Sequence, residues 1–269
     1  MSQYNIVLVG CGKMGSSLVR GWLAENLIEK IQIVDPNEID ESFTHLPTVF
    51  HVKHFDSVDF QGVSLCVLAT KPQIMDNVCK NLKPYVSNDI SFLSIAAGVK
   101  IDAFETQLGT SNIIRSMPNT PAAIGKGMTV LCATSDVPQE AKDAVTNLMN
   151  AVGQIQWIDN EEMMDAVTAV SGSGPAYLFY FIEALAKSAE KQGFAENDAY
   201  QLAVQTVIGA AALAENDASK AVHELRKNVT SPGGTTEAGL SILMDGRLDD
   251  ILNETLDAAT QRGKELGKN

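Results

Sequence analysis

The sequence predicts an α/β fold, in which an N-terminal doubly wound parallel sheet is followed by an all-helical domain. Short apolar segments alternate with segments of helical spacing through residues 1–159, which is the pattern of successive βαβ units. From residue 160 to residue 269 strand-like runs almost vanish, and apolar residues recur at helical spacing. A chain of 269 residues is long enough for two domains of ordinary size, which we place at 1–159 and 160–269.

The first strand is predicted over Ile6–Val9, a short apolar and β-branched run that is typical of a buried parallel strand. It leads into a G-x-G-x-x-G motif, after which helical spacing runs from Ser16 to Leu23. Glycines between a strand and a helix let a pyrophosphate approach the backbone and the helix N-terminus. A purely structural glycine turn is the alternative. We therefore predict a Rossmann-like dinucleotide-binding domain, with contacts from Gly10, Cys11, Gly12, Lys13, Met14 and Gly15.

The second strand, Ile31–Val34, ends at Asp35, at the distance from the glycines that the dinucleotide motif requires. A carboxylate here accepts hydrogen bonds from the adenosine ribose and repels a 2′-phosphate, which favours NADH slightly over NADPH. Two alternatives remain open. Asp35 could cap the loop to Pro36, or a shift in register could bring Asn37 nearer the ribose.

Further strands and helices complete the predicted sheet domain. Strands are expected over Val63–Ala69, Ile90–Ile95, Ile113–Met117 and Met128–Ala133, and helices over Gln73–Leu82 and Gln139–Val152. Residues 43–60 are weakly patterned and are expected to be peripheral. Ligands of such folds bind beyond the carboxyl ends of the strands. Besides Gly10 and Asp35, the residues at these ends are Ala69, Thr70, Lys71, Pro72, Ala97, Gly98, Met117 and Asn119.

One segment of the helical half, Tyr177–Ile182, is apolar on nearly every side, so it should be buried all round. About 110 residues of helix form a thin core by themselves. We therefore expect this domain to pack against a second copy in a homodimer. The alternative is that the apolar helix packs entirely within its own chain.

A second candidate site lies in the segment Val229–Thr236, just before helical spacing resumes. Pro232 interrupts the preceding element, and Gly233 and Gly234 allow a tight turn with exposed amides. We expect Thr235 or Thr236 to cap the following helix. Free N–H groups at a helix start form a receptor for a small carboxylate, although an ordinary Pro-Gly loop would look the same in isolation.

Composition narrows the class of protein. The formal net charge of −13 disfavours nucleic acid and anionic membranes as principal partners, and no apolar run is long enough to span a membrane. The four cysteines are scattered without C-x-x-C spacing, which is typical of a reduced, cytoplasmic protein. His51 and His54 lie three residues apart but lack converging ligands, so no metal site is expected.

Taken together, the motifs resemble those of the pyrroline-5-carboxylate reductase family, and the resemblance covers almost the whole chain. The segments that carry it are Gly10–Gly15, Thr70–Pro72, Ser94–Gly98, Arg115–Pro121, Gly172–Tyr177 and Val229–Thr236. The glycine motif is shared by many dehydrogenases, whereas the last two segments in this order are far more discriminating. One departure is that the family often has a His-Pro pair where this chain has Ala221-Val222-His223.

The resemblance implies an enzyme that transfers a hydride from NADPH or NADH to the C=N carbon of 1-pyrroline-5-carboxylate, giving L-proline. It places the substrate carboxylate on the amides of Ser231, Gly233, Gly234 and Thr235, and the hydroxyl of Thr236 beside the imine nitrogen. Thr236 or solvent water then supplies the proton. It also places Lys71, Met117 and Asn119 around the nicotinamide end of the cofactor. Members form homodimers, which can assemble further.

Two other functions are compatible with parts of the pattern. Reductases of β-hydroxyacids share the architecture but use a helix lysine in a Gly-x-x-Gly-x-x-x-Lys-x-x-Asn pattern, and no lysine follows Gly174 here until Lys187. A non-catalytic redox sensor would bind a dinucleotide but would not need the second site at Pro232–Thr236. Both observations favour the imine reductase.

Overall fold

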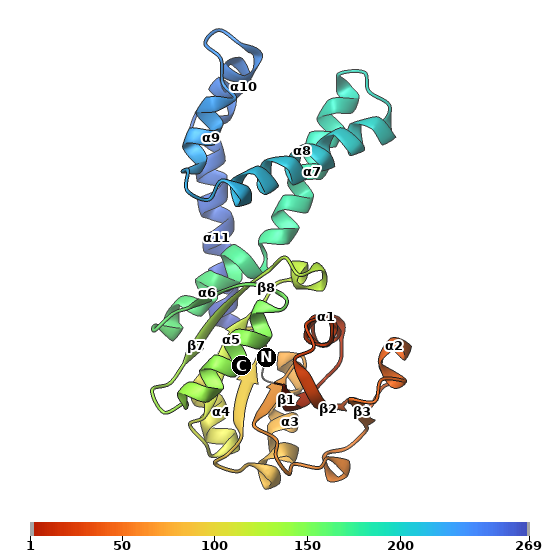
Figure 1. Ribbon diagram of the computed structural model, residues 1–269. Helices are drawn as coiled ribbons and strands as arrows, with labels where there is room; N and C mark the ends of the chain where they lie inside the picture. The colour runs from red at the N-terminus through yellow and green to blue at the C-terminus, as the bar shows by residue number, and fades with distance from the viewer. Residues whose placement is uncertain (1–2, 268–269) are drawn as a thin grey trace. The chain divides into compact units, whose positions relative to one another are not determined.

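The computed structural model describes residues 3–267, and its first part contains one eight-stranded sheet (Figure 1). The strands are β1 (Tyr4–Val9), β2 (Ile28–Val34), β3 (Val49–Val52), β4 (Leu65–Leu68), β5 (Ser91–Ser94), β6 (Ile113–Met117), β7 (Gly127–Ala133) and β8 (Gly153–Trp157). Their order across the sheet is β3-β2-β1-β4-β5-β6-β7-β8. Every neighbouring pair is parallel except β6 and β7. The order reverses direction between β1 and β4, where such folds bind their ligands.

Helices cover both faces of the sheet because its strands are apolar on both sides. Helices α1 (Lys13–Ala24) and α5 (Gln139–Asn150) share one core with Ile6 and Leu8 of β1. On the other face, α3 (Met75–Leu82) and α4 (Ile101–Leu108) share a second core with Val7 and Val9. The short helix α2 (Glu41–Thr44) precedes β3. This arrangement confirms the predicted doubly wound α/β fold.

Two strands were not expected from the sequence. β3 lies at one edge of the sheet, where it pairs with a neighbour on one side only and Phe50 is half exposed. An edge strand of this kind is not marked by a long run of apolar residues in the sequence. β8 lies at the other edge, and its glutamines alternate with Ile155 and Trp157, so it lacks the continuous apolar run of the inner strands. β2 also begins earlier than predicted, at Ile28.

The second half is helical, as predicted. Its elements are α6 (Met164–Val167), a π-helical turn (Thr168–Gly172), α7 (Gly174–Lys191), α8 (Glu196–Asn216), α9 (Val222–Asn228), α10 (Thr235–Leu243) and α11 (Arg247–Leu266). The chain divides into two compact units. One reaches to Ser173 and includes the residues from Ala259 onward, and the other spans Gly174–Ala258. The boundary between residues 159 and 160 that the sequence suggested stays a prediction.

The second unit buries few of its apolar side chains. Its buried apolar residues, within the described chain, are the alanines Ala186, Ala199 and Ala203. On α7, Phe179 is 61% exposed and Tyr180 is 69% exposed. The interpretation in which this helix buries its apolar side chains within its own chain is therefore wrong. These side chains are available for a contact with a second copy.

Candidate active site

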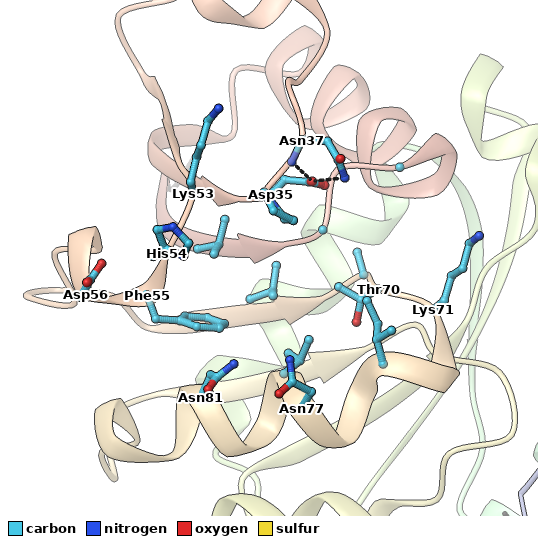
Figure 2. A pocket seen from close by; sticks show the side chains of 18 of the residues that line it. Asp35, Asn37, Lys53, His54, Phe55, Asp56, Thr70, Lys71, Asn77 and Asn81 are labelled. Carbon is cyan, nitrogen blue, oxygen red and sulfur yellow. Dashed lines mark hydrogen bonds between the residues drawn. The ribbon is translucent and has the colours of Figure 1, made fainter.

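A cleft of about 750 Å³ opens at the carboxyl ends of β1, β2 and β4 (Figure 2). Its volume lies within the usual range for cofactor sites. The cleft brings together six of the predicted cofactor residues. They are Gly10, Gly12, Asp35, Ala69, Thr70 and Lys71. The site therefore lies at the reversal of strand order, where the sheet topology predicts it.

The three motif glycines occupy three different environments. Gly10 has φ of 91°, and a Cβ there would lie 2.7 Å from the Thr70 side chain. A Cβ on Gly15 would lie 2.5 Å from the carbonyl oxygen of Gly10, so α1 packs closely on the turn. A Cβ on Gly12 would have no atom within 4 Å. The first glycine makes the turn, the third allows helix packing, and the second leaves the backbone open to a ligand, which fits a bound dinucleotide.

The N-terminus of α1 begins directly at this open position. Gly12 is its N-cap, and no side chain within residues 3–267 caps the helix. The amide of Ser16 is the first to find an acceptor in the helix, donating to the Gly12 carbonyl at 2.9 Å. The helix amides that precede Ser16 therefore remain available for a phosphate, and the helix dipole favours the negative charge of that phosphate.

Asp35 connects the end of β2 to the glycine turn. One carboxylate oxygen accepts the backbone N–H of Cys11 at 2.8 Å. The other accepts the backbone N–H of Asn37 at 2.9 Å and its side-chain amide at 3.2 Å. The capping role that the sequence left open is therefore present in the structure. Each carboxylate oxygen can accept two hydrogen bonds, so the oxygen facing Cys11 retains capacity for a ribose hydroxyl.

Cys11 itself is half-buried, with its sulfur 3.6 Å from the Ser16 hydroxyl. Burial raises the pKa of the thiol, and the nearby charge of Asp35 acts in the same direction. A thiol with a raised pKa stays protonated near neutral pH and is a weak nucleophile. Cys11 is therefore best described as a small filler of the turn.

The sequence did not identify several residues of the cleft. Lys53, His54 and Phe55 reach it from the loop after β3, and Asn77 and Asn81 reach it from α3 (Figure 2). The spacing of four residues between the two asparagines places both on one face of the helix. The loop residues were missed because β3 was not predicted, so its carboxyl end was not considered.

Nine other predicted cofactor residues do not line this cleft, and some of them make contacts inside the protein instead. Asn119 is 8% exposed, accepts the Met128 N–H at 2.8 Å and donates to the Ser171 carbonyl at 3.0 Å. A Cβ on Gly98 would lie 3.3 Å from Leu266 of α11. Residues in this group are Cys11, Lys13, Met14, Gly15, Pro72, Ala97, Gly98, Met117 and Asn119. Their predicted contact with the cofactor remains untested.

The second candidate site precedes α10. Gly234 is the N-cap, and none of the side chains that the structure describes caps the helix, so the predicted capping by Thr235 or Thr236 is wrong. Instead, the Glu237 carboxylate reaches back past the N-cap and accepts the N–H of the preceding residue, Gly233, at 2.6 Å. The threonines cannot act as caps because the helix already begins at Thr235.

The amides of this turn are only partly engaged. Gly234 donates to the Ser231 carbonyl at 3.0 Å, and the first amide of α10 to find an acceptor is that of Ala238. Within residues 3–267, the amides of Thr235, Thr236 and Glu237 have no acceptor. Three free N–H groups at the start of a helix attract an anion. The cleft belongs to the first compact unit and this turn to the second.

A doubly wound sheet, with an open glycine turn and a cleft at its strand reversal, defines a protein of the Rossmann-like, dinucleotide-binding class. Sequence comparison then identifies the family. The family "Pyrroline-5-carboxylate reductase dimerisation" matches residues 161–266, and "NADP oxidoreductase coenzyme F420-dependent" matches residues 5–98. The pyrroline-5-carboxylate reductase of Pseudomonas aeruginosa is 35% identical over 100% of this chain and 98% of the relative. The chain belongs to the pyrroline-5-carboxylate reductase family.

Solved structures agree with this assignment. A pyrroline-5-carboxylate reductase from Coxiella burnetii superposes with a TM-score of 0.91 at 35% identity, covering 100% of both chains. The enzyme from Plasmodium falciparum, solved with NADP bound, gives a TM-score of 0.84 at 30% identity over 99% of both chains. The resemblance predicted from the motifs is confirmed. Among the described residues, no helix is long and apolar enough to cross a membrane.

Proposed function

We propose that the protein reduces 1-pyrroline-5-carboxylate to L-proline with NADPH or NADH, the last step of proline synthesis. The observation that carries this proposal is the open backbone at Gly12 within a cleft of about 750 Å³. Relatives that match the chain over its full length are named pyrroline-5-carboxylate reductase. A hydride adds to the imine carbon and a proton adds to the nitrogen. The nicotinamide is oxidised as the C=N bond becomes a single bond.

The cofactor is held by the glycine turn and the strand ends around it. The amides at the start of α1, next to Gly12, bind the pyrophosphate, and Asp35 with Asn37 orients the adenosine ribose. Thr70 and Lys71 lie at the end of β4 and orient the nicotinamide half. When bound, the cofactor supplies the hydride, and the protein contributes its position and exclusion of water.

The substrate carboxylate is bound by the turn before α10. The amides of Ser231, Gly233, Gly234 and Thr235 form the proposed receptor. That of Thr235 is free, whereas that of Gly234 also donates to the Ser231 carbonyl. The Gly233 amide is held by Glu237, whose carboxylate carries the same charge as the substrate. Binding at Gly233 therefore requires the Glu237 side chain to move away, because one amide cannot serve both carboxylates well.

Thr236 is the proposed catalytic residue. It occupies the second position of α10, beside the free amides, and its hydroxyl can donate to or accept from the imine nitrogen. A neutral hydroxyl is a weak acid, so Thr236 orients the imine and relays a proton that ultimately comes from water.

The proposed assembly is a homodimer formed through the helical unit, with dimers able to associate further. The exposed apolar side chains of α7 and the match to a dimerisation family support it. We also place the protein in the cytoplasm, a setting that the four free cysteines favour.

A direct assay tests the function. Oxidation of NADPH and NADH is followed by absorbance with and without 1-pyrroline-5-carboxylate, and proline is identified as the product. Substrate-dependent oxidation with formation of equimolar proline is expected. Cofactor binding without any such oxidation would point to the redox sensor or to a different imine or keto substrate.

A further inference from the structure

The adenosine end of the cleft combines charges of both signs. Asp35 contributes a carboxylate at the end of β2, and a carboxylate there repels a 2′-phosphate. No arginine follows it in sequence, since the next residues are Pro36, Asn37 and Glu38. Yet the P. falciparum relative was solved with NADP, which carries that phosphate. If this chain binds the 2′-phosphate, the positively charged side chain that contacts it must come from another element.

The structure supplies that charge from the loop after β3. Lys53 and His54 line the cleft together with Asp35 and Asn37. In Figure 2, Lys53 rises at the rim of the cleft beside Asp35, and His54 lies below it. β3 pairs with β2, so the residue after Val52 comes next to the turn that follows Val34. This chain has no arginine directly after Asp35, and the nearby positive charge comes instead from Lys53 at the end of the adjacent strand.

Lys53 is held at this rim by an acidic partner. Its Nζ lies 2.8 Å from the Oε1 of Glu38, and the two side chains are 55% and 80% exposed. Such an exposed ion pair contributes little and opens easily. A 2′-phosphate carries more charge and more acceptor oxygens than a carboxylate, so it competes well for the ammonium group.

The carboxylate of Asp35 already interacts with neighbouring groups of the protein. It accepts hydrogen bonds from the Cys11 and Asn37 amides and from the Asn37 side chain. Those donors offset its negative field at the rim, since each points a positive hydrogen at the carboxylate. A phosphate that sits beside Asn37, facing Lys53, therefore meets less repulsion than the sequence alone suggests.

We propose that Lys53 recognises the 2′-phosphate of NADPH, and that Glu38 limits this preference by competing for the lysine. Lys53 is then the residue that sets the choice between the two cofactors, and Asp35 mainly fixes the glycine turn. The inference rests on the proposed use of an adenine dinucleotide, but it concerns the adenosine half alone.

Calorimetric titration with 2′,5′-ADP and 5′-ADP isolates the contribution of the phosphate. Lys53→Met keeps the aliphatic stem and removes the charge. Its affinity for 2′,5′-ADP should fall roughly tenfold, as for the loss of a charge-assisted hydrogen bond, with 5′-ADP changed less than twofold. Glu38→Gln should strengthen 2′,5′-ADP binding about threefold, because the competing charge is gone. The effect of Lys53→Met should shrink at high salt.

Lys30→Met is the matched control. Lys30 also forms an ion pair at the surface, with Asp59 at 2.9 Å, although its side chain is only 30% exposed, and it does not line the cleft. The control changes net charge equally and should leave both affinities within twofold. Equal losses for both nucleotides in Lys53→Met, or no loss in either, would overturn the proposal. So would a control that behaves like Lys53→Met.

The titration is independent of the proposed reaction. If the unmodified protein binds 2′,5′-ADP through Lys53 but oxidises no cofactor with 1-pyrroline-5-carboxylate, the proposed reaction fails and the phosphate site stands. If oxidation occurs and Lys53→Met does not change the ratio of kcat/KM for NADPH and NADH, the phosphate site fails and the reaction stands.

Discussion

At the scale of single residues, the three glycines of the turn differ in the space around the position where a Cβ would lie. The Cβ positions of Gly10 and Gly15 are filled by the protein's own atoms, whereas that of Gly12 is open. Gly12 also has φ of −70°, which any residue adopts easily. Its lack of a side chain is therefore not needed for folding, and we attribute it to cofactor binding.

Substitution of Gly12 should weaken cofactor binding, whereas substitution of Gly15 should lower the stability of the fold. Gly12→Val should fold normally and bind NADPH at least about 100-fold more weakly, because its side chain fills the space that the pyrophosphate needs. Gly15→Ala should lower the free energy of unfolding by about 1–3 kcal/mol, because its Cβ meets the Gly10 carbonyl. Urea unfolding and cofactor titration of both variants check this. Normal NADPH binding by Gly12→Val would contradict it.

Thr236 should affect the chemical step and not the binding of the cofactor. Thr236→Ala should lower kcat roughly tenfold or more, because the imine loses its hydrogen-bonding partner. The dissociation constant for NADPH should be unchanged, since α10 lies outside the unit that holds the cleft. Thr236→Ser keeps the hydroxyl and should recover most of the rate. Unaltered proline formation by Thr236→Ala would remove the residue from the mechanism.

The sequence predicted residues whose role depends on the local backbone, and it missed those whose role depends on neighbouring elements. Gly10, Gly12 and Asp35 belong to a motif with fixed spacing, so they could be found. Lys53 reaches the cleft only because β3 pairs with β2. The cap of α10 was wrongly assigned because the helix starts at Thr235 and Glu237 reaches back instead.

At the scale of elements, the buried side chain of Asn119 connects three segments. It follows β6, accepts the amide of Met128 on β7 and donates to Ser171 in the π-helical turn. A π-helical turn is uncommon and often marks a functional region. Gly172 in that turn is also packed tightly against Met117. The predicted contact of Asn119 with nicotinamide competes with this structural role.

Asn119→Ala separates the two roles. It leaves the Met128 amide and the Ser171 carbonyl without their partner, so the free energy of unfolding should fall by about 1–3 kcal/mol. The KM for NADPH should stay within about twofold at temperatures where the variant remains folded. A large rise in that KM with unchanged stability would instead assign Asn119 to the cofactor.

The inner strands could be predicted from the sequence, and the edge strands could not. β1 from Ile6 onward and β4 are apolar, and β5 carries Phe92 and Leu93 between two buried serines, because both faces of these strands are covered by helices. β3 and β8 are paired on one side only and carry polar or exposed side chains, so no run of apolar residues marks them. Helices α1, α3 and α5 were predicted near their observed positions, whereas α4, which has only eight residues, was not predicted.

At the scale of the whole molecule, the helical unit is incomplete as a single chain. Large apolar side chains on α7 and α8 are exposed, among them Phe179, Tyr180 and Tyr200. Residues 161–266 match a dimerisation family, which accounts for that exposure. The sequence could predict a second copy, because a helix that is apolar all round cannot remain in water. It could not show which side chains would be covered.

Tyr180→Asp should disrupt the dimer. A charge introduced among apolar side chains remains unpaired on association, so the dimer dissociation constant should rise by about 100-fold or more. Analytical ultracentrifugation measures the change. Phe50→Asp, at an exposed aromatic on β3, is the control and should leave the dimer intact. A dimer of normal strength in Tyr180→Asp would place the contact elsewhere.

In the proposed reaction, a nicotinamide bound at the glycine turn passes its hydride to a cyclic imine. The most direct test uses NADPH or NADH deuterated at the nicotinamide C4 on the transferred face. Incubation with 1-pyrroline-5-carboxylate should give proline with one deuterium on its δ carbon, detected by mass spectrometry and NMR, and Gly12→Val should form it far more slowly at the same cofactor concentration. Proline without deuterium at that carbon, or no proline from protein that binds the cofactor, would contradict this hydride transfer.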